Sequence, residues 1–346
     1  MAERARLLAV CTQGGVGDLL AATPAMRALQ RHFDAPISVL ASAYAAPIIE
    51  GHPAVGEVIV AEGLPPGRAA AEQIARRRFT HAVVFWSSAR IAALVQRARI
   101  PVRVGQSRRL YSWRYTKRVR VRSEAGDVRS HWTDIQMDYA RALGASPRSD
   151  DFRIIVEVRP QDKAEAQSAL RCFQVEAPFV VLHAARGIQL QGRRWPVNAF
   201  AAIGDSLSEA FGAKVVLTGS AAEAELIAGI AARMRTSAAV LAGAVSLRGL
   251  AALLARAAVV VALDSGPMHV AAAVGAPTLG VFALRTDLPQ RWRPLGPRVA
   301  LIGPTFPCPS AHRKENCPDF ACYAALSPRS IVDGARAIAA QTVGPR

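Results

Sequence analysis

A repeated alternation of short apolar runs and longer segments with helical periodicity most constrains how this chain can fold. β-rich runs are expected at residues 7–11, 37–41, 58–60 and 80–85, with helical segments near 18–31, 44–50, 68–78 and 89–99. Strands that alternate with helices of this length favour parallel sheets whose two faces are covered by helices. The chain is therefore predicted to be an α/β protein.

The same alternation starts again in the second half. Strands are expected at 179–183, 214–218, 259–263 and 278–282, with helices at 197–211, 221–234, 246–256 and 268–274. The polar stretch 146–167 separates the two runs, and a length of 346 residues fits two domains. We therefore expect two doubly wound domains that face a cleft. Ligands in such sheets bind beyond the carboxyl ends of the strands, which makes candidate sites of the loops after Cys11, His183, Thr218 and Leu263.

The composition is strongly basic, with 43 Lys and Arg against 26 Asp and Glu and a formal charge of +17. This excess favours anionic partners such as phosphates, nucleic acid or a membrane surface. No run approaches the roughly 18 apolar residues of a spanning helix, and the first apolar run is short for a secretory signal. Five cysteines, an odd number, do not indicate a disulfide scaffold. We expect a cytoplasmic protein.

A glycine-rich turn follows the first expected strand and opens a helix, with the sequence Gly14-Gly15-Val16-Gly17-Asp18. Glycines allow backbone N–H groups to approach a ligand, and a helix N-terminus favours negative charge. The turn lacks the G-x-G-x-x-G pattern of dinucleotide-binding proteins and the lysine of a Walker A motif, so nicotinamide chemistry and nucleotide hydrolysis are disfavoured. Asp18 can cap its own helix or act as a base, and the two roles are compatible.

The sharpest local pattern in the second half is Leu263-Asp264-Ser265-Gly266-Pro267-Met268-His269. An acid follows a strand and Ser-Gly-Pro starts a helix, where N–H groups can hold a phosphate while Asp264 contacts a sugar hydroxyl. A Ser/His/Asp hydrolase is disfavoured, because the G-x-S-x-G elbow is missing and three triad members within six residues do not easily reach the needed geometry. For His269, local context alone favours a packed helix histidine.

Three other groups of residues could carry chemistry. Arg193 and Arg194 precede Trp195 between a strand and a helix, and can bind a phosphate or form a solvated pair beside a core tryptophan. Glu223 falls in the first turn of a helix, where acids are common caps. A third group lacks C-x-x-C spacing, so reduced thiols are favoured over a zinc site: Cys308, Cys317 and Cys322, with His312 between them.

Residues 97–122 contain ten basic side chains and no acid, interleaved with Tyr111, Trp113 and Tyr115. Aromatic side chains among arginines can stack on bases or sugars, or lie at a membrane interface. A merely solvated face usually mixes charges of both signs, so a functional anion site is favoured. No zinc finger, RNP sequence or other nucleic-acid motif accompanies the stretch.

Taken together, these loops make the chain resemble glycosyltransferase family 9, the ADP-heptose:lipopolysaccharide heptosyltransferases. The resemblance covers almost the full length and rests on the order and spacing of GGVGDLLAATPAMRAL (14–29), RRWPVNAF (193–200), LTGSAAEAE (217–225), LAGAVSLRGLAALLARA (241–257) and DSGPMHVAAAVGAPTLGVF (264–282), with a Pro- and Cys-rich tail before a last helix. It implies a GT-B fold of two Rossmann-like domains. The acceptor domain would comprise 1–165 and the donor domain 166–326, with a C-terminal helix in 327–346 that returns to the N-terminal domain.

The resemblance also implies residue roles. Asp18 would be the general base of an inverting transfer. The donor nucleotide-sugar would be held by Arg193 near the diphosphate, Glu223 at the ribose, and the loop of Asp264, Ser265, Gly266, Pro267 and His269. The acceptor would be bound by Gly15, Gly17, Arg108, Arg109 and Arg114. No metal and no cofactor is expected, because arginine and helix N-termini can stabilise a leaving diphosphate.

The implied partners are ADP-heptose, a Kdo-bearing lipid A or lipopolysaccharide core acceptor, and the anionic inner-membrane surface, with no specific nucleic acid. The enzyme would be cytoplasmic and peripherally associated with the cytoplasmic face of the inner membrane. Arg193 stands where the family usually has lysine, and Ala283-Leu284-Arg285-Thr286 stands where Gly-x-Thr is common. These departures leave the identity of the donor open, and the Asp264-Ser265-Gly266 loop keeps a transferase or epimerase for another nucleotide sugar as an alternative. A basic nucleic-acid-binding protein also stays open, because of the net charge and the stretch of arginines and aromatic residues.

Overall fold

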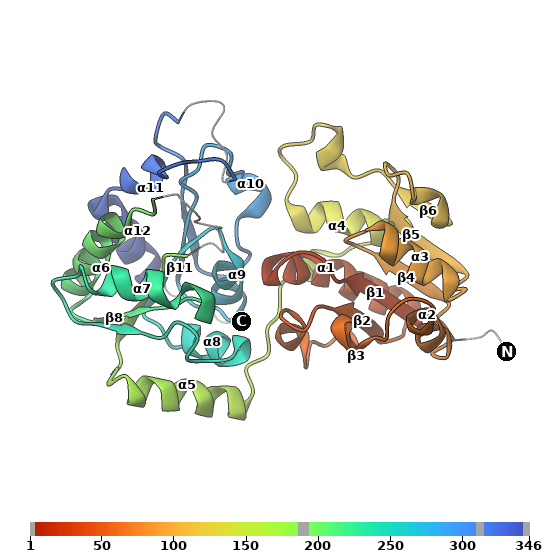
Figure 1. Cartoon of the computed structure of the whole chain (residues 1–346), viewed down its shortest axis with the longest axis horizontal. Coiled ribbons are helices and arrows are strands. Elements are labelled where there is room, and N and C mark those ends of the chain that lie inside the picture. The colour runs from red at the N-terminus through yellow and green to blue at the C-terminus, as the bar shows by residue number, and fades with distance from the viewer. Residues whose placement is uncertain (1–3, 186–193, 309–314, 342–346) are drawn as a thin grey trace. The chain divides into compact units, whose positions relative to one another are not determined.

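The computed structural model describes residues 4–185, 194–308 and 315–341. The chain divides into two compact units, unit 1 (Met1–Glu157) and unit 2 (Val158–Arg346). Figure 1 shows that each unit is a sheet with helices packed on it. The boundary between the units comes eight residues before the predicted one, which falls inside a helix.

Unit 1 is built on a parallel sheet with the order β3-β2-β1-β4-β5-β6. Its strands are β1 (Leu7–Cys11), β2 (Ile37–Ala41), β3 (Val55–Val60), β4 (His81–Val84), β5 (Val102–Gln106) and β6 (Lys117–Val119). Its α-helices are α1 (Val16–Phe33), α2 (Arg68–Ala75), α3 (Ala89–Arg97) and α4 (Trp132–Arg141). All five residues of β1 are buried, as expected for a central parallel strand covered on both faces.

Unit 2 repeats this plan with the order β12-β11-β10-β7-β8-β9. Its strands are β7 (Phe179–His183), β8 (Lys214–Leu217), β9 (Ala238–Val240), β10 (Val259–Leu263), β11 (Thr278–Val281) and β12 (Val299–Ile302). Its helices are α5 (Pro160–Cys172), α6 (Val197–Phe211), α7 (Ala224–Ala231), α8 (Leu247–Leu254), α9 (Gly266–Ala273), α10 (Pro289–Trp292), α11 (Ala321–Ala324) and α12 (Pro328–Ala339). Counted from its own first strand, each sheet has the order 3-2-1-4-5-6 of a Rossmann fold, which confirms the predicted fold class.

The polar stretch expected to separate the domains contains most of α5. The buried residues of this helix are Asp162, Ala166 and Leu170, spaced four apart. Hydrogen bonds from Arg248 on α8 offset the cost of burying Asp162. Arg248 Nε lies 3.1 Å from each carboxylate oxygen, and Nη2 lies 2.8 Å from Oδ2. A charged residue therefore occupies a core-facing position, and this hides the helical periodicity.

The C-terminal helix α12 packs on the sheet of unit 2. Its buried residues Ile331, Ala335 and Ile338 belong to the hydrophobic core that also contains residues of β7, β10 and α6. The apolar face of α12 is thus buried within unit 2, and the expectation that the C-terminal helix returns to the N-terminal domain stays a prediction. Among the described residues, no helix has both the length and the apolar character needed to cross a bilayer.

Candidate functional site

Each sheet has a point where the strand order reverses, and the candidate residues lie beside it. In unit 1 this point is at β1, which pairs with β2 on one side and β4 on the other. In unit 2 it is at β7, between β8 and β10. Ligands of doubly wound sheets bind beyond the carboxyl ends of the strands at such points. Asp18 follows β1 and Asp264 follows β10, so both are placed as this rule requires.

The turn after β1 is shaped around the Asp18 carboxylate. Asp18 Oδ2 accepts a hydrogen bond from the Gly15 N–H at 2.7 Å, and Gly15 is the N-cap residue of α1. Gly14 has φ +94°, and a Cβ at this position would lie 2.7 Å from Asp18 Oδ2. Gly17 lies in the first turn of the same helix. The helix-capping interpretation of Asp18 is thus confirmed, and its role as a base stays a prediction.

The charge of Asp18 acts on the end of β1. Burial raises the pKa of the Cys11 thiol above its usual range, and the negative charge of Asp18 raises it further. Cys11 is therefore held as a neutral thiol beneath the turn, where it packs as a small apolar group.

In unit 2, the loop after β10 is short and ordered. The Asp264 N–H donates to the carbonyl of Val281 at 3.2 Å, and the Ser265 hydroxyl donates to the carbonyl of Leu263 at 2.9 Å. Ser265 is the N-cap of α9, which begins at Gly266 with Pro267 in its first turn. The N-terminal N–H groups of α9 thus lie at the carboxyl edge of the sheet, where they can receive an anion. His269 is buried on α9, in agreement with the packed-histidine interpretation.

The carboxyl ends of β7 and β8 meet through a histidine that sequence analysis did not select. His183 Nδ1 lies 3.0 Å from Thr218 Oγ1. Burial lowers the pKa of His183 to about 4, although the nearby Glu223 charge acts in the opposite direction. Glu223 Oε2 accepts from the N–H and the hydroxyl of Ser220 at 2.8 and 2.7 Å, so the predicted cap is confirmed. A polar residue at the end of a buried strand was the signal that could have identified His183.

Arg193 lies outside the described residues, and its proposed phosphate contact stays a prediction. Trp195 stacks on Phe200 with ring centroids 5.6 Å apart, and it also contacts Phe320 and Tyr323. The core-tryptophan interpretation of this motif is therefore confirmed.

The cysteines near the C-terminus adjoin this aromatic cluster. Cys317 and Cys322 are buried, and burial raises the pKa of Cys322 to about 12. Cys317 Sγ accepts a hydrogen bond from the Phe320 N–H at 3.3 Å. No group of three or more His, Cys, Asp or Glu among the described residues is arranged to hold a metal ion. His312 lies outside the described residues, so the zinc hypothesis stays untested.

The arginines of the basic stretch are partly used for structure. Arg109 forms an ion pair with Glu124 through both carboxylate oxygens, and Arg108 donates to the Glu124 carbonyl at 3.1 Å. Arg114 donates to the Gln96 side chain, and its guanidinium lies 4.3 Å from the centroid of the Trp113 ring. These three residues thus lie in one region of unit 1, held by neutral groups and a single acid.

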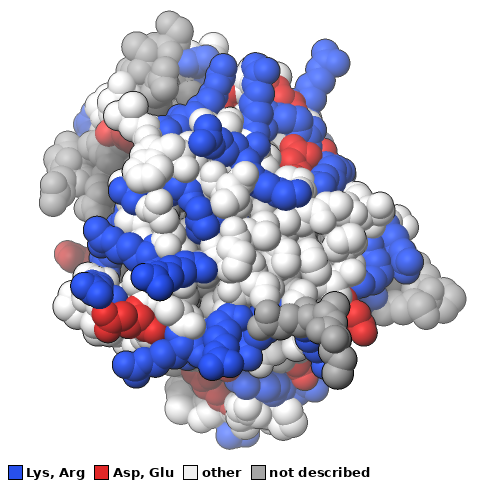
Figure 2. All heavy atoms as spheres, turned by 90° about the vertical axis from the view of Figure 1, so that its right-hand side faces the viewer, with Lys and Arg blue, Asp and Glu red and all other residues white. Residues whose placement is uncertain are grey.

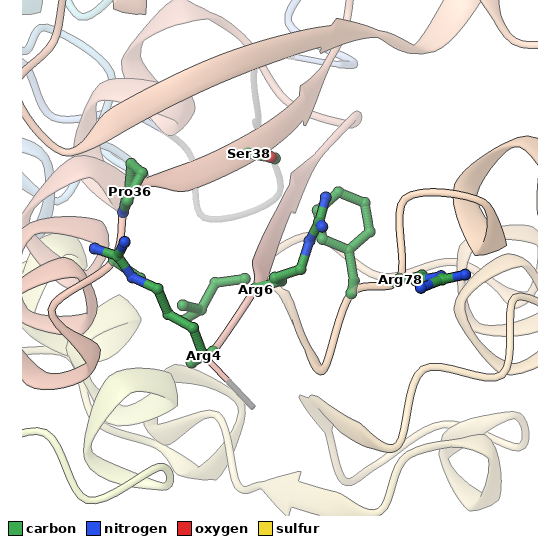
Figure 3. A pocket seen from close by; sticks show the side chains of 9 residues that line it. Arg4, Arg6, Pro36, Ser38 and Arg78 are labelled. Atoms are coloured by element: carbon green, nitrogen blue, oxygen red, sulfur yellow. The ribbon is translucent and has the colours of Figure 1, made fainter. Parts of the chain in front are cut away.

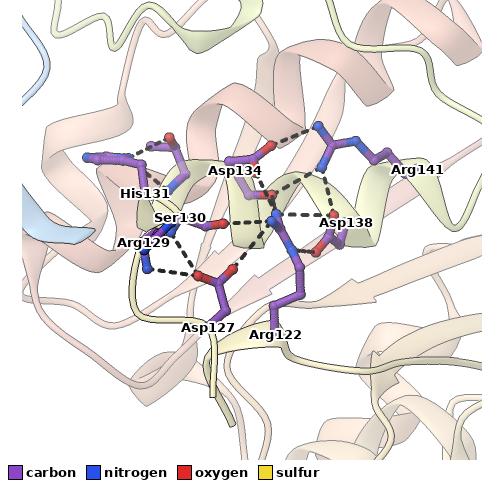
Figure 4. A network of polar contacts seen from close by, with 9 residues as sticks. Arg122, Asp127, Arg129, Ser130, His131, Asp134, Asp138 and Arg141 are labelled. Carbon is purple, nitrogen blue, oxygen red and sulfur yellow. Dashed lines mark hydrogen bonds and ion pairs between the residues drawn. The ribbon is translucent and has the colours of Figure 1, made fainter. Parts of the chain in front are cut away.

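Arg122, the last residue of the stretch, is the centre of an ionic network (Figure 4). It contacts Asp134 at 2.6 Å, Asp138 at 2.7 Å and Asp127 at 3.6 Å. Arg141 contacts the carboxylates of Asp134 and Asp138 at 2.8 and 2.7 Å. The acids that balance Arg122 come from positions after the basic stretch, so inspection of the stretch alone could not reveal them.

A hollow of about 330 Å³ lies at the carboxyl edge of the unit 1 sheet and was not predicted. It combines an apolar lining with a few polar groups, the usual composition of a small-molecule site. The basic groups Arg90 and Arg97 are seven residues apart on α3. Other lining residues are Thr12, Gln13, Leu40, Glu62, Ser88 and Leu94. Thr12 and Gln13, which line the hollow, directly follow β1 and precede the glycine turn.

A second hollow of about 490 Å³ lies at the opposite, amino-terminal edge of the same sheet. Arg4, Arg6 and Arg78 line it, but Figure 3 shows Arg78 extending away from Arg6 and Arg4 extending toward Pro36. The three guanidinium groups do not converge on one point. Figure 2 shows blue Lys and Arg side chains spread widely over this side of unit 1, with few red acids among them.

The geometry can be compared with known proteins. A family model described as glycosyltransferase family 9 (heptosyltransferase) matches residues 68–320. Lipopolysaccharide heptosyltransferase 2 of Salmonella typhimurium is 27% identical over 288 residues, covering 77% of this chain and 80% of that protein.

Solved structures agree on the fold. A family 9 glycosyltransferase from Veillonella parvula has a TM-score of 0.81 at 20% identity and covers 98% of both chains. The Escherichia coli ADP-heptose lipopolysaccharide heptosyltransferase II has a TM-score of 0.78 at 23% identity, covering 96% of this chain and 98% of the other. The predicted GT-B fold class is confirmed. The protein is a glycosyltransferase, and it belongs to glycosyltransferase family 9, the heptosyltransferase family.

Proposed function

We propose that this protein transfers a heptose from ADP-heptose to the inner core of lipopolysaccharide, with inversion at the anomeric carbon and without a metal ion. The observation that carries the proposal is the Asp18 carboxylate, fixed by the Gly15 N–H beside β1 in a chain of family 9. Its relatives include a protein named lipopolysaccharide heptosyltransferase 2, from Salmonella typhimurium, and this supports a heptose as the sugar and lipopolysaccharide as the acceptor.

In the proposed reaction, Asp18 takes the proton from an acceptor hydroxyl as that oxygen attacks the anomeric carbon of the donor. The carbon–oxygen bond to the diphosphate breaks on the opposite face, so the configuration inverts. General-base catalysis of this kind contributes about 10²–10⁴-fold to the rate. A carboxylate suits the role because its position is fixed before the acceptor binds.

The donor is proposed to lie against unit 2. Glu223 would bind the ribose, and Asp264, Ser265, Gly266, Pro267 and His269 would form the loop around the sugar and phosphates. Arg193 and the N-terminus of α9 would stabilise the charge that develops on the leaving diphosphate. Positive groups beside the diphosphate can supply the stabilisation that a metal supplies elsewhere.

The acceptor is proposed to lie against unit 1, near Gly15 and Gly17. The 330 Å³ hollow lined by Arg90 and Arg97 offers room and positive charge for a phosphorylated sugar. Arg108, Arg109 and Arg114 would bind further anionic groups. A Kdo-bearing lipid acceptor places the reaction at the cytoplasmic face of the inner membrane, whose anionic surface would attract a chain of charge +17.

A thermal-shift panel with ADP, UDP, GDP and CDP tests the donor. Ligand at about 100 times its dissociation constant stabilises the folded state by about 2.7 kcal/mol, which raises the melting temperature measurably. A selective shift with ADP, followed by heptose transfer to a truncated core, is the expected result. A selective UDP or GDP shift would instead indicate a transferase or epimerase for another nucleotide sugar. Sequence-specific RNA or DNA binding without any nucleotide shift would contradict the enzyme assignment of the site.

A further inference from the structure

The turn between β5 and β6 exposes two large apolar side chains within four residues. Leu110 is 100% exposed and Trp113 is 58% exposed. Single exposed apolar residues are ordinary on protein surfaces. Here, however, the two accompany the basic side chains of Arg108, Arg109 and Arg114, so apolar and cationic groups share one short turn.

The exposure of Leu110 does not come from a loosely held loop. The Tyr111 hydroxyl donates to the Ser87 carbonyl at 2.8 Å and accepts from Gln106 Nε2 at 3.1 Å. The Ser112 hydroxyl donates to the Gln106 carbonyl at 2.6 Å and accepts from the Arg109 N–H at 3.1 Å. Tyr111 and Ser112 therefore anchor the turn inward, and the fold presents Leu110 to solvent in a fixed position.

The charges around the turn are almost all positive. Arg108, Lys117, Arg118 and Arg120 are exposed, and Glu124 is the acid that pairs with Arg109. The Arg114 guanidinium lies over the Trp113 ring, a cation–π arrangement that keeps a charge beside the indole. A surface that takes up leucine and tryptophan while binding several cations must offer apolar groups beneath a layer of negative charge.

We propose that this turn docks on a bilayer of anionic phospholipid, with Leu110 entering the acyl region, Trp113 lying at the interface and the flanking arginines binding lipid phosphates. Tryptophan is enriched at this depth, and basic residues near the surface add electrostatic attraction. Nucleic acid fits less well, because it has no apolar layer for Leu110.

The placement of the turn gives the docking a direction. Ser87, which binds Tyr111, follows β4, and Gln106 ends β5, so the turn begins at the carboxyl edge of the sheet where Asp18 lies. The turn then runs back along β5, because the Arg114 carbonyl accepts a hydrogen bond from Arg103 Nε at 2.8 Å, so docking would bring the β5–β6 side of the sheet to the lipid surface. The inference rests on the proposed function in one respect, since a lipid-linked acceptor gives the docking its purpose.

Co-sedimentation of the full chain with vesicles tests the proposal. Vesicles of phosphatidylcholine with phosphatidylglycerol should bind it, and vesicles of phosphatidylcholine alone should bind it weakly. Leu110→Ser should lower the partition coefficient on the anionic vesicles about tenfold, the factor for losing one leucine from an apolar layer. Arg108→Gln should lower it about fivefold on anionic vesicles only. Leu301→Ser removes a partly exposed leucine of unit 2 and serves as the matched control, with binding unchanged.

Trp113 supplies a second readout. Its fluorescence should shift to shorter wavelength when anionic vesicles are added, and Trp113→Phe should lose this change while it still binds. Vesicle binding of Leu110→Ser equal to that of the wild type would overturn the proposal. So would a wild-type protein that self-associates through this turn, or binds RNA through it, without binding vesicles.

The two proposals fail separately. If the docking is wrong but the function is right, ADP still raises the melting temperature. Leu110→Ser and wild type then transfer heptose equally well, whether the acceptor is dispersed in detergent or embedded in anionic vesicles. If the function is wrong, no ADP shift or transfer appears, and the vesicle results still decide the docking.

Discussion

Asp18 and Glu223 share a local geometry, since each carboxylate accepts a hydrogen bond from the backbone N–H three residues earlier. Asp151 and Asp162 have the same arrangement, with N–H···O distances of 2.7 and 2.8 Å. Capping was therefore predictable from the sequence, but it does not identify a site. What separates Asp18 is the glycine turn, which the sequence shows, and its place where the strand order of the sheet reverses at β1, which becomes visible only when the strands are assembled.

We predict that Asp18→Asn lowers heptose transfer by about 10²–10⁴-fold, because the amide cannot accept the proton of the acceptor. The dissociation constant for ADP should change little. Steady-state transfer rates and ADP titration measure the two effects. Asp151→Asn is the matched control, because Asp151 caps in the same way but pairs with Arg31 away from the turn. A loss of transfer below tenfold for Asp18→Asn would contradict the base assignment.

Gly14→Ala should destabilise the protein by about 1–3 kcal/mol and lower turnover as well. The left-handed backbone at φ +94° disfavours a side chain, and the new Cβ would displace the Asp18 carboxylate. Gly126→Ala introduces similar strain at φ +93°, with nothing within 4 Å of the new Cβ. Urea unfolding should show a lower free energy of unfolding in both variants, and turnover should fall only in Gly14→Ala. Equal turnover in the two would separate the turn from catalysis.

Acidification should destabilise both units through two buried histidines. Burial lowers the pKa of His52 and of His183 to about 4, against about 6.5 in an unfolded chain. Between these values the unfolded state binds more protons, so stability is complete above pH 6.5 and is lost as the pH falls toward 4. At pH 5 each histidine should contribute a loss of about 2 kcal/mol. Urea titrations at pH 7 and at pH 5 measure the free energy of unfolding. If His52→Gln and His183→Gln lost as much stability between these pH values as the wild type, this account would be contradicted.

At the scale of elements, the sequence located the central strands β1, β2, β7 and β10 with their observed bounds, because these are continuous apolar runs. It missed β5, β6, β9 and β12, which are short, lie toward or at the sheet edges, and in β5 and β6 carry basic residues. Helix α5 was missed because Asp162 occupies a core position. Such elements depend on contacts between segments far apart in sequence, as between Asp162 and Arg248. The periodicity of the local sequence does not reveal these contacts.

The Arg122 network should stabilise the link between the loop after β6 and α4. Arg122→Met should lower the free energy of unfolding by about 1–2 kcal/mol, because Asp134 and Asp138 lose a hydrogen-bonded partner while their partial exposure screens the charge. Arg118→Met removes an exposed arginine from β6 and is the matched control. Urea unfolding of the two variants, compared with wild type, measures the difference. Equal stability would show that the network contributes nothing measurable.

At the scale of the whole molecule, two copies of one topology each bury their own core. One core cluster draws on β1, β2, β4 and α3, and another on β7, β8, β10 and α12. The sequence predicted this duplication from its repeated alternation of strands and helices. It could not predict how the basic excess is divided between structural ion pairs and surface, because the partners of Arg109 and Arg122 depend on the fold.

Calorimetry should therefore resolve two unfolding transitions, one for each unit. ADP should raise the melting temperature of the unit 2 transition alone, because the proposed donor loops belong to this unit. At 100 times its dissociation constant, ADP should stabilise the folded unit by about 2.7 kcal/mol. His183→Gln identifies that transition by moving it selectively. A shift of the unit 1 transition by ADP would place the nucleotide on the other unit and contradict the donor assignment.

The buried pair of Asp162 and Arg248 has a practical consequence for anyone who divides this protein. Their side chains are only 5% and 6% exposed, and one precedes residue 166 while the other follows it. A recombinant fragment that starts at residue 166 would lack the Asp162 carboxylate and leave the buried Arg248 guanidinium without this counter-charge, which costs several kcal/mol. A fragment that starts at residue 158 retains it. Eight residues at an apparent linker thus decide whether the second half can be produced on its own.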